Sequence, residues 1–148
     1  MGRKGIIRRL FALLAGILSF GMGACTLPSE LSDEEIMRTE AAIVDGARAI
    51  PGVTDVRLNY GRKGPTGSLN LDGRISIASA NPSLARAAFE ELHRIAASVL
   101  PDRSDSYLNM YVVADDDEYF RFEERDLGFA NPRPSFHEVI EIFGNSGE

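Results

Sequence analysis

Leu69-Asn70-Leu71-Asp72-Gly73-Arg74-Ile75-Ser76-Ile77 is the stretch on which the predicted fold depends. Asp-Gly often forms a two-residue hairpin turn, but a turn at Asp72-Gly73 would put Leu71 on the same face as Arg74. One continuous strand, bulged or kinked at Gly73, keeps the four aliphatic side chains together on a single face. We therefore predict one strand from Leu69 to Ile77.

A helix and a strand precede this stretch. Ser32 and Glu35 have the spacing of a capping box, and Pro51-Gly52 ends the helix that they begin. Alternating apolar residues then predict a strand over Val53–Tyr60. The apolar residues of the helix recur at helical spacing and are expected in the core: Ile36, Met37, Ile43, Val44, Ala47 and Ile50.

A second helix follows the stretch. Asn81-Pro82 combines an N-cap with a proline at the first helical position, so this helix should run to about Leu100. Its apolar stripe is expected to place His93 on the solvent side. The residues expected to be buried are Leu84, Ala88, Leu92, Ile95 and Val99.

The remaining elements are shorter. Tyr107–Ala114 alternates as a strand, Asp115–Glu118 turns the chain, and Tyr119–Glu123 follows. Ser135 and Glu138 then make another capping box, which predicts a short helix over Phe136–Phe143.

The order helix-strand-strand therefore occurs twice, with weak sequence similarity at an offset of 50 residues. Pro51, Thr54, Asp55, Leu58 and Asn59 align with Pro101, Ser104, Asp105, Leu108 and Asn109. We predict an α+β fold, a two-layer sandwich in which a four-stranded antiparallel sheet has two helices on one face. These tandem αββ units would be ferredoxin-like in a permuted order. The domain is expected over residues 32–123, with a tail and short C-terminal helix over residues 124–148.

The first 25 residues form a distinct segment. A basic head that includes Arg8 and Arg9 precedes an uncharged run of 15 residues, Leu10–Ala24, and then the only cysteine, Cys25. At ~1.5 Å per residue the run would reach ~22 Å as a helix, short of the ~30 Å bilayer core. The segment thus has the form of an exported leader.

This segment resembles the signal peptide of a bacterial membrane lipoprotein, whose motif ends in two small residues and a cysteine, here Met22-Gly23-Ala24-Cys25. The family usually has Leu where this chain has Met22. The resemblance implies a signal peptide over residues 1–24, cleavage between Ala24 and Cys25, and an acyl lipid such as palmitate on Cys25. Residues 25–31 would be a short tether to the cell membrane, with the domain outside the cytoplasm. Ordinary secretion and an uncleaved short anchor remain alternatives.

Charge limits the classes of partner. The first 25 residues hold four of the 16 basic residues and none of the 22 acidic ones, which leaves 12 against 22, or −10. Nucleic-acid binding needs clustered positive charge, so no nucleic-acid partner is expected. The same balance argues against electrostatic attachment to anionic lipid, so a lipid anchor would act alone.

Few residues suggest chemistry. His93 and His137 share no motif, and no thiol is available to complete a zinc site. The acidic run Asp115–Glu118 could hold calcium, but it lacks the calcium-loop spacing and is interpreted as a solvated hairpin tip. We predict no catalytic residue, metal or cofactor, although sequence alone leaves Ser/His/Asp catalysis open.

The solvent face of the sheet is the candidate partner surface, because Tyr and Arg are favoured where proteins meet partners. Its candidate residues are Arg57, Arg74, Tyr107, Tyr111, Tyr119 and Arg121. In the alternative, the apolar tail covers this face and packs on the tyrosines, through Leu127, Phe129, Phe136, Ile140 and Phe143.

The expected function is therefore a non-catalytic, lipid-anchored binding module of the cell envelope, which would bind an envelope protein. A small envelope hydrolase that uses clustered carboxylates is one alternative. Another follows from Asp72–Ile77 and the helix after it, which resemble the BON module of bacterial envelope proteins and imply a BON-like envelope-binding role. The oligomeric state stays open.

Overall fold

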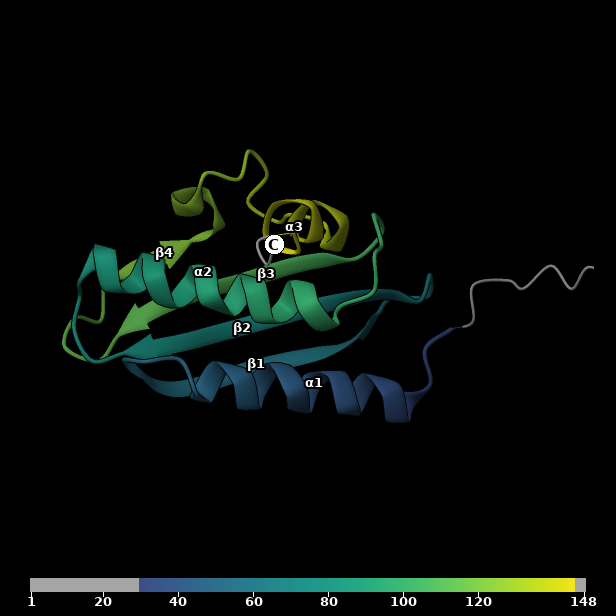
Figure 1. Cartoon of the computed structure of the whole chain (residues 1–148), viewed down its shortest axis with the longest axis horizontal. Coiled ribbons are helices and arrows are strands. Elements are labelled where there is room, and N and C mark those ends of the chain that lie inside the picture. Colours follow the sequence, from purple (N-terminus) through teal and green to yellow (C-terminus); the bar gives the residue numbers. More distant parts are fainter. Residues whose placement is uncertain (1–29, 146–148) are drawn as a thin grey trace, which may run out of the picture.

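The computed structural model describes residues 30–145, which form three α-helices, a short 3-10 helix and one four-stranded sheet (Figure 1). In chain order the elements are α1 (Asp33–Arg48), β1 (Val53–Lys63), β2 (Ser68–Ile77), α2 (Pro82–Val99), β3 (Tyr107–Ala114), β4 (Arg121–Glu123), η1 (Glu124–Leu127) and α3 (Phe136–Phe143). The α+β class is as predicted. The leader, its cleavage position and Cys25 lie outside the described residues.

The sheet is mixed, and the antiparallel prediction is wrong at its centre. The strand order is β1-β2-β3-β4; β1 and β2 are antiparallel, β2 and β3 are parallel, and β3 and β4 are antiparallel. The 18-residue helix α2 explains the difference. It returns the chain along the sheet as a crossover connection, so that β3 starts at the same end as β2.

The tandem-unit prediction fails for the same reason. β1 is an edge strand that runs opposite to the interior strand β3. Two units with opposite strand directions and helices on the same face could be related only by a rotation about an axis perpendicular to the sheet. Such a rotation would also reverse the order of the two strands in the second unit, whereas the observed order is β1-β2 and then β3-β4. Leu108 is fully buried opposite Leu71, whereas Leu58 is half-buried opposite Gly73. The offset of 50 residues therefore marks no structural repeat, and the arrangement is not ferredoxin-like.

Strand β2 is continuous, as its aliphatic pattern predicted. Gly73 has a φ of +134°, and its pairing with Leu58 continues the register without a break. A Cβ atom at Gly73 would lie 2.0 Å from the backbone oxygen of Arg57. The strand therefore requires glycine at this position, since a side chain has no room there.

The predicted helix starts are confirmed. Ser32 and Ser135 each form a capping box with the glutamate three residues later, Glu35 and Glu138. Asn81 accepts hydrogen bonds from the N–H groups of the second and third residues of α2, which begins at Pro82. These caps satisfy amide groups that a helix start would otherwise leave without partners.

The helices lie on one face of the sheet, with α1 over β1 and α3 beside α2 (Figure 1). One core fills the space between these layers. Its fully buried members include Ile43, Leu71, Ile75, Phe89, Leu92, Leu108, Val112, Phe136 and Val139. No helix among residues 30–145 has the length and apolarity that crossing a membrane requires.

The buried faces of the long helices differ from the prediction. In α1, Met37 is 65% exposed, and in α2, Val99 is 37% exposed. The buried face of α2 instead includes Phe89 and His93. Because α3 and the tail pack along one side of α2, its buried arc is rotated toward these two residues.

Candidate functional site

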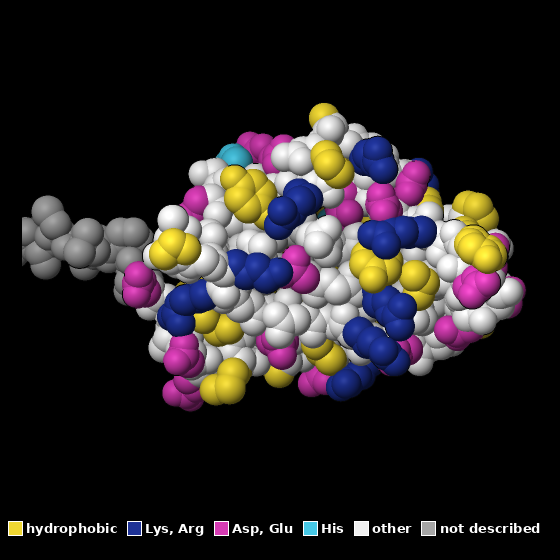
Figure 2. Space-filling model, turned by 180° about the vertical axis from the view of Figure 1, so that it is seen from behind, with side chains coloured by type: hydrophobic (Ala, Val, Ile, Leu, Met, Phe, Trp, Pro, Cys, Tyr) yellow, Lys and Arg dark blue, Asp and Glu magenta, His cyan; other side chains and the backbone are white. Residues whose placement is uncertain are grey.

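The face of the sheet that points away from the helices is made of polar and aromatic side chains. Leu71, Ile75 and Val112 point into the core, so the residues next to them in β2 and β3 point outward. Figure 2 shows this open face, with Lys and Arg side chains spread across its middle and hydrophobic side chains between them. We call it the open sheet face.

Four of its residues form one row across the strands. Strand pairing places Arg57 beside Arg74, Arg74 beside Tyr111, and Tyr111 beside Glu123. Neighbouring strands lie about 4.8 Å apart, so the row joins positions that are distant in sequence. It brings together three of the predicted surface residues.

Arg121 belongs to the same cluster. It lies in the adjacent row, and its guanidinium carbon is 3.8 Å from the centre of the Tyr111 ring, a cation–π contact. Arg121 also donates a hydrogen bond to Glu123, which binds Arg125 as well. Hydrogen bonding to Arg121, the largest cause, holds the pKa of Glu123 below its ordinary value.

A second row lies beside the first, where Asp72 on β2 has Asn59 on one side and Asn109 on the other. The Asn109 amide donates to Asp72 Oδ1 over 3.4 Å. Lys63 Nζ lies 2.5 Å from Asp72 Oδ2, an ion pair that lacks hydrogen-bond geometry. Asp72 is therefore paired with Lys63 and is not an ion-pair partner of Arg74.

Arg74 is distinct from the other cations of this face. Arg57 pairs with Asp55 at 2.9 Å, and Lys63 and Arg121 also have carboxylate partners. Among residues 30–145, Arg74 has neither an ion-pair nor a hydrogen-bond partner. It is half-buried on the interior strand β2, near the middle of the face.

Two predicted surface residues lie apart from this cluster. Tyr107 is on the same face but at the start of β3, where its side chain is 37% exposed. Tyr119 is outside the sheet, because β4 begins only at Arg121. Asp117 holds the preceding turn by accepting a hydrogen bond from the Tyr119 N–H, and the Tyr119 side chain is 87% exposed.

The described tail lies on the helix side, so it does not cover the open sheet face. Phe136 packs against Tyr60, and Phe129 and Phe143 pack against His93. Helix α3 contacts α2 (Figure 1). Through residue 145, the alternative in which the tail covers the tyrosines of the sheet is wrong.

His93 is buried, and the prediction of a solvated histidine is wrong. It has no exposed surface, its Nδ1 lies 2.8 Å from the Phe89 carbonyl, and its Nε2 has no partner among the described residues. Burial lowers its pKa to about 4, against a smaller opposing effect of the Phe89 bond. His93 is thus a neutral core residue within an aromatic cluster.

His137 is exposed at the other end of the tail helix. Its Nδ1 lies 2.7 Å from Asp102, and its Nε2 lies 3.5 Å from Glu141. The bond to Asp102 raises its pKa. Nowhere in the described chain do three His, Cys, Asp or Glu side chains meet in a way that could hold a metal ion.

The acidic turn uses its carboxylates separately. Asp115 accepts from the Thr54 hydroxyl at 2.7 Å, and Asp116 accepts from the Ala80 N–H at 2.7 Å. Asp117 caps the turn itself. The three carboxylates thus bind three different donors.

Glu124 is a buried carboxylate that sequence analysis missed. It is 2% exposed and accepts a hydrogen bond from the Met110 N–H at 2.7 Å. Burial, the largest cause, raises its pKa to about 7. A raised pKa is typical of catalytic acids, but Glu124 lies inside the protein on a backbone group. The sequence gives no signal for this burial, because Glu124 lies within the charged run Glu123–Asp126 and only the structure shows that it faces the core.

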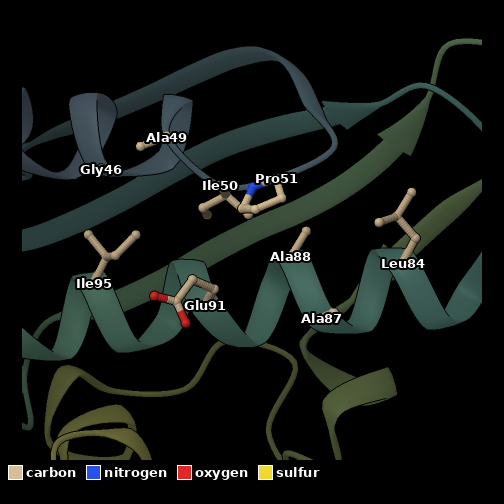
Figure 3. Close-up of a pocket in the computed structure, with 9 residues that line it drawn as sticks. All are labelled: Gly46, Ala49, Ile50, Pro51, Leu84, Ala87, Ala88, Glu91 and Ile95. Atoms are coloured by element: carbon tan, nitrogen blue, oxygen red, sulfur yellow. The ribbon is translucent and has the colours of Figure 1, made fainter.

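The described residues also form hollows away from the open sheet face. An apolar groove of about 560 Å³ separates the end of α1 from α2; Ile50, Pro51, Leu84 and Ile95 line it, and Glu91 stands at its edge (Figure 3). A more polar hollow of about 600 Å³ lies near Glu30, lined in part by Arg62 and Arg103. Both arginines there are paired with aspartates, Asp33 and Asp105.

Comparison with known proteins adds no relative: the chain matches no protein-family model, no curated protein and no solved structure.

Proposed function

We propose that this chain is a lipid-anchored protein of the cell envelope and a non-catalytic binding module, whose open sheet face binds a protein partner. The observation that carries the proposal is the row Arg57–Arg74–Tyr111 on a face that the described tail leaves uncovered. Arg and Tyr are, together with Trp, enriched among the residues that supply most of the binding energy near the centre of an interface.

The size and shape of the face support a protein partner. It spans three long strands of 11, 10 and 8 residues, and an extended strand rises about 3.3 Å per residue. Three neighbouring strands of this length make a broad surface. Small molecules prefer concave, largely apolar pockets, whereas proteins bind broad surfaces with an aromatic and arginine centre.

The anchor rests on the leader and on Cys25. The six residues 26–31 between that cysteine and the cap of α1 can span at most about 20 Å, so the domain would stay close to the membrane. Two or more acyl chains hold a protein at a bilayer stably, at about 0.8 kcal/mol per buried methylene. The N-terminus of α1 lies at one end of the long axis of the domain (Figure 1). The open sheet face would therefore point along the membrane plane and not toward the bilayer.

The anchor is tested by mass spectrometry of the protein from native membranes. We expect an N-terminal peptide that begins at Cys25 and carries acyl mass, and a Cys25→Ser variant that lacks it and leaves the membrane fraction or keeps its leader. A mature N-terminus elsewhere, without acyl mass, would refute the anchor.

The surface is tested by photo-cross-linking in the same membranes. p-Benzoylphenylalanine in place of Tyr107, on the open sheet face, is expected to trap a protein adduct. The same reagent in place of Met37, exposed on α1, is the control and is expected to trap none. Adducts from position 37 but not from position 107 would place the partner on the helices and end the proposal.

A further inference from the structure

We infer that the partner contributes a carboxylate to Arg74, as an Asp or Glu side chain or a chain end, at the centre of the open sheet face. This inference rests on the proposed function and specifies the chemistry of that partner. It starts from the one arginine of the face that has no ion-pair or hydrogen-bond partner among residues 30–145.

The surroundings of Arg74 leave its guanidinium available. The nearest acids by register are Asp72 on its own strand and Asp55 beyond Arg57, and each already has a cation, Lys63 and Arg57. Arg74 is half-buried between Arg57 and Tyr111. A partly desolvated guanidinium with several unused donors is costly in isolation and becomes favourable when an anion pairs with it.

Tyr111 contributes to the geometry of the site around Arg74. Its ring lies under Arg121, so the ring is held in place next to Arg74. A carboxylate that binds a guanidinium through two parallel hydrogen bonds needs a fixed plane. Arg57 and Tyr111 flank Arg74 in the row, so its side chain has a neighbouring side chain on each side.

A protein carboxylate fits this face better than an anionic membrane. Membrane adsorption requires clusters of roughly four to eight unneutralised basic residues. Of the cations here, Arg57, Lys63 and Arg121 are neutralised by Asp55, Asp72 and Glu123. One open charge among asparagine and tyrosine side chains is the pattern of a specific protein interface.

The first test combines the Tyr107 photo-cross-linker with changes at Arg74 in the full lipidated chain. Arg74→Glu is expected to lower the yield of the protein adduct at least tenfold, whereas Arg38→Glu, on the solvent side of α1, leaves it unchanged. Both variants are checked for an unchanged melting temperature. A full adduct yield with Arg74→Glu would overturn the inference and leave the proposed function standing.

The second test uses Arg74→Lys, which keeps the charge and supplies an amine. A carbodiimide activates a partner's carboxylate, and the amine at position 74 then displaces the activator as a urea and forms an amide bond. We expect a covalent protein adduct in native membranes whose amide is mapped by peptide mass spectrometry to position 74 in this variant, and no amide at position 38 in the control Arg38→Lys; Lys63, which both variants keep, gives the same background in each. Photo-adducts at position 107 without amide formation at position 74 would show that the anion is not a carboxylate.

Two further outcomes would end the inference together with the proposed binding surface. If position 107 traps lipid instead of protein, the ligand is an anionic headgroup and the open sheet face has no protein partner. If position 107 traps nothing, the open sheet face is not a binding surface, and both proposals fail together.

Discussion

The carboxylate of Glu124 accepts a hydrogen bond from the backbone N–H of Met110 at 2.7 Å. β4 pairs with β3 only along Tyr111–Val113, so Met110 lies beyond its end. The Glu124 side chain thus takes the place of a missing strand, and the Pro134 carbonyl does the same for Leu108. These contacts close the β3 edge, which would otherwise offer unpaired groups to other chains.

Glu124 should make stability depend on pH near neutrality. Burial raises its pKa to about 7 from a model-peptide value of 4.5, so the folded state favours the protonated acid. Its contribution to the free energy of unfolding is complete below pH 4.5 and is lost as pH rises through about 7. The free energy of unfolding should therefore fall by up to about 3 kcal/mol between pH 5 and 8 in the unsubstituted protein, and Glu124→Gln should abolish this fall. Urea unfolding at both pH values measures it. The same loss in the variant would show that another group titrates.

His93 should act in the opposite direction. Burial lowers its pKa to about 4 from 6.5, so its contribution to stability is complete above pH 6.5 and is lost as pH falls through about 4. His93→Phe fits the cluster of Phe89, Phe129 and Phe143 and should reduce the fall in melting temperature between pH 6.5 and 4. His137→Asn is the control at an exposed histidine. An acid loss that is unchanged in His93→Phe would contradict the buried neutral state.

Gly73 should tolerate no side chain. Gly73→Ala would place a Cβ 2.0 Å from the Arg57 carbonyl at a φ of +134°. Such backbone strain alone costs about 1–3 kcal/mol, and the clash adds to it. Gly61→Ala in β1 is the matched control, because no atom lies within 4 Å of its Cβ position. Chemical denaturation should separate the two variants, and equal stabilities would contradict the close backbone approach at Gly73.

Substitutions at Leu108 and Leu58 should differ in their effect on stability, although the two residues align in the sequence. Leu108 is fully buried on an interior strand, so Leu108→Ala should lower the free energy of unfolding by about 2–5 kcal/mol. Leu58 is half-buried on the edge strand, so Leu58→Ala should cost clearly less. Equal losses in equilibrium unfolding would favour a true repeat over the mixed sheet.

Local signals in the sequence predicted the elements well. Capping boxes at Ser32 and Ser135 and the cap at Asn81 located three helix starts, because a cap is a contact between residues two or three positions apart. The alternation around Gly73 likewise gave a continuous strand. These predictions needed only near neighbours in the chain.

The errors concern contacts between distant segments. Nothing local in β2 or β3 shows whether they pair in parallel, since the path of α2 decides it. His93 was misplaced because its burial depends on Phe129 and Phe143, far along the chain. The strand faces did place Arg57, Arg74 and Tyr111 outward correctly, but only the register shows that they form one row.

The accessibility of a single introduced thiol in native membranes is the most direct test of the open sheet face as the binding surface. Cys25 is the only cysteine, and a lipid would block its sulfur, so an added cysteine would report alone. Asn109→Cys reports on the open sheet face, and Ala41→Cys reports on the exposed side of α1. Each is labelled with a membrane-impermeant maleimide in native membranes and again after purification in detergent.

We predict that position 109 reacts at least fivefold more slowly in native membranes than after purification, because the partner covers it. Position 41 should react at the same rate in both. Equal rates for position 109 in membranes and in the purified protein would contradict the claim that the open sheet face binds a partner.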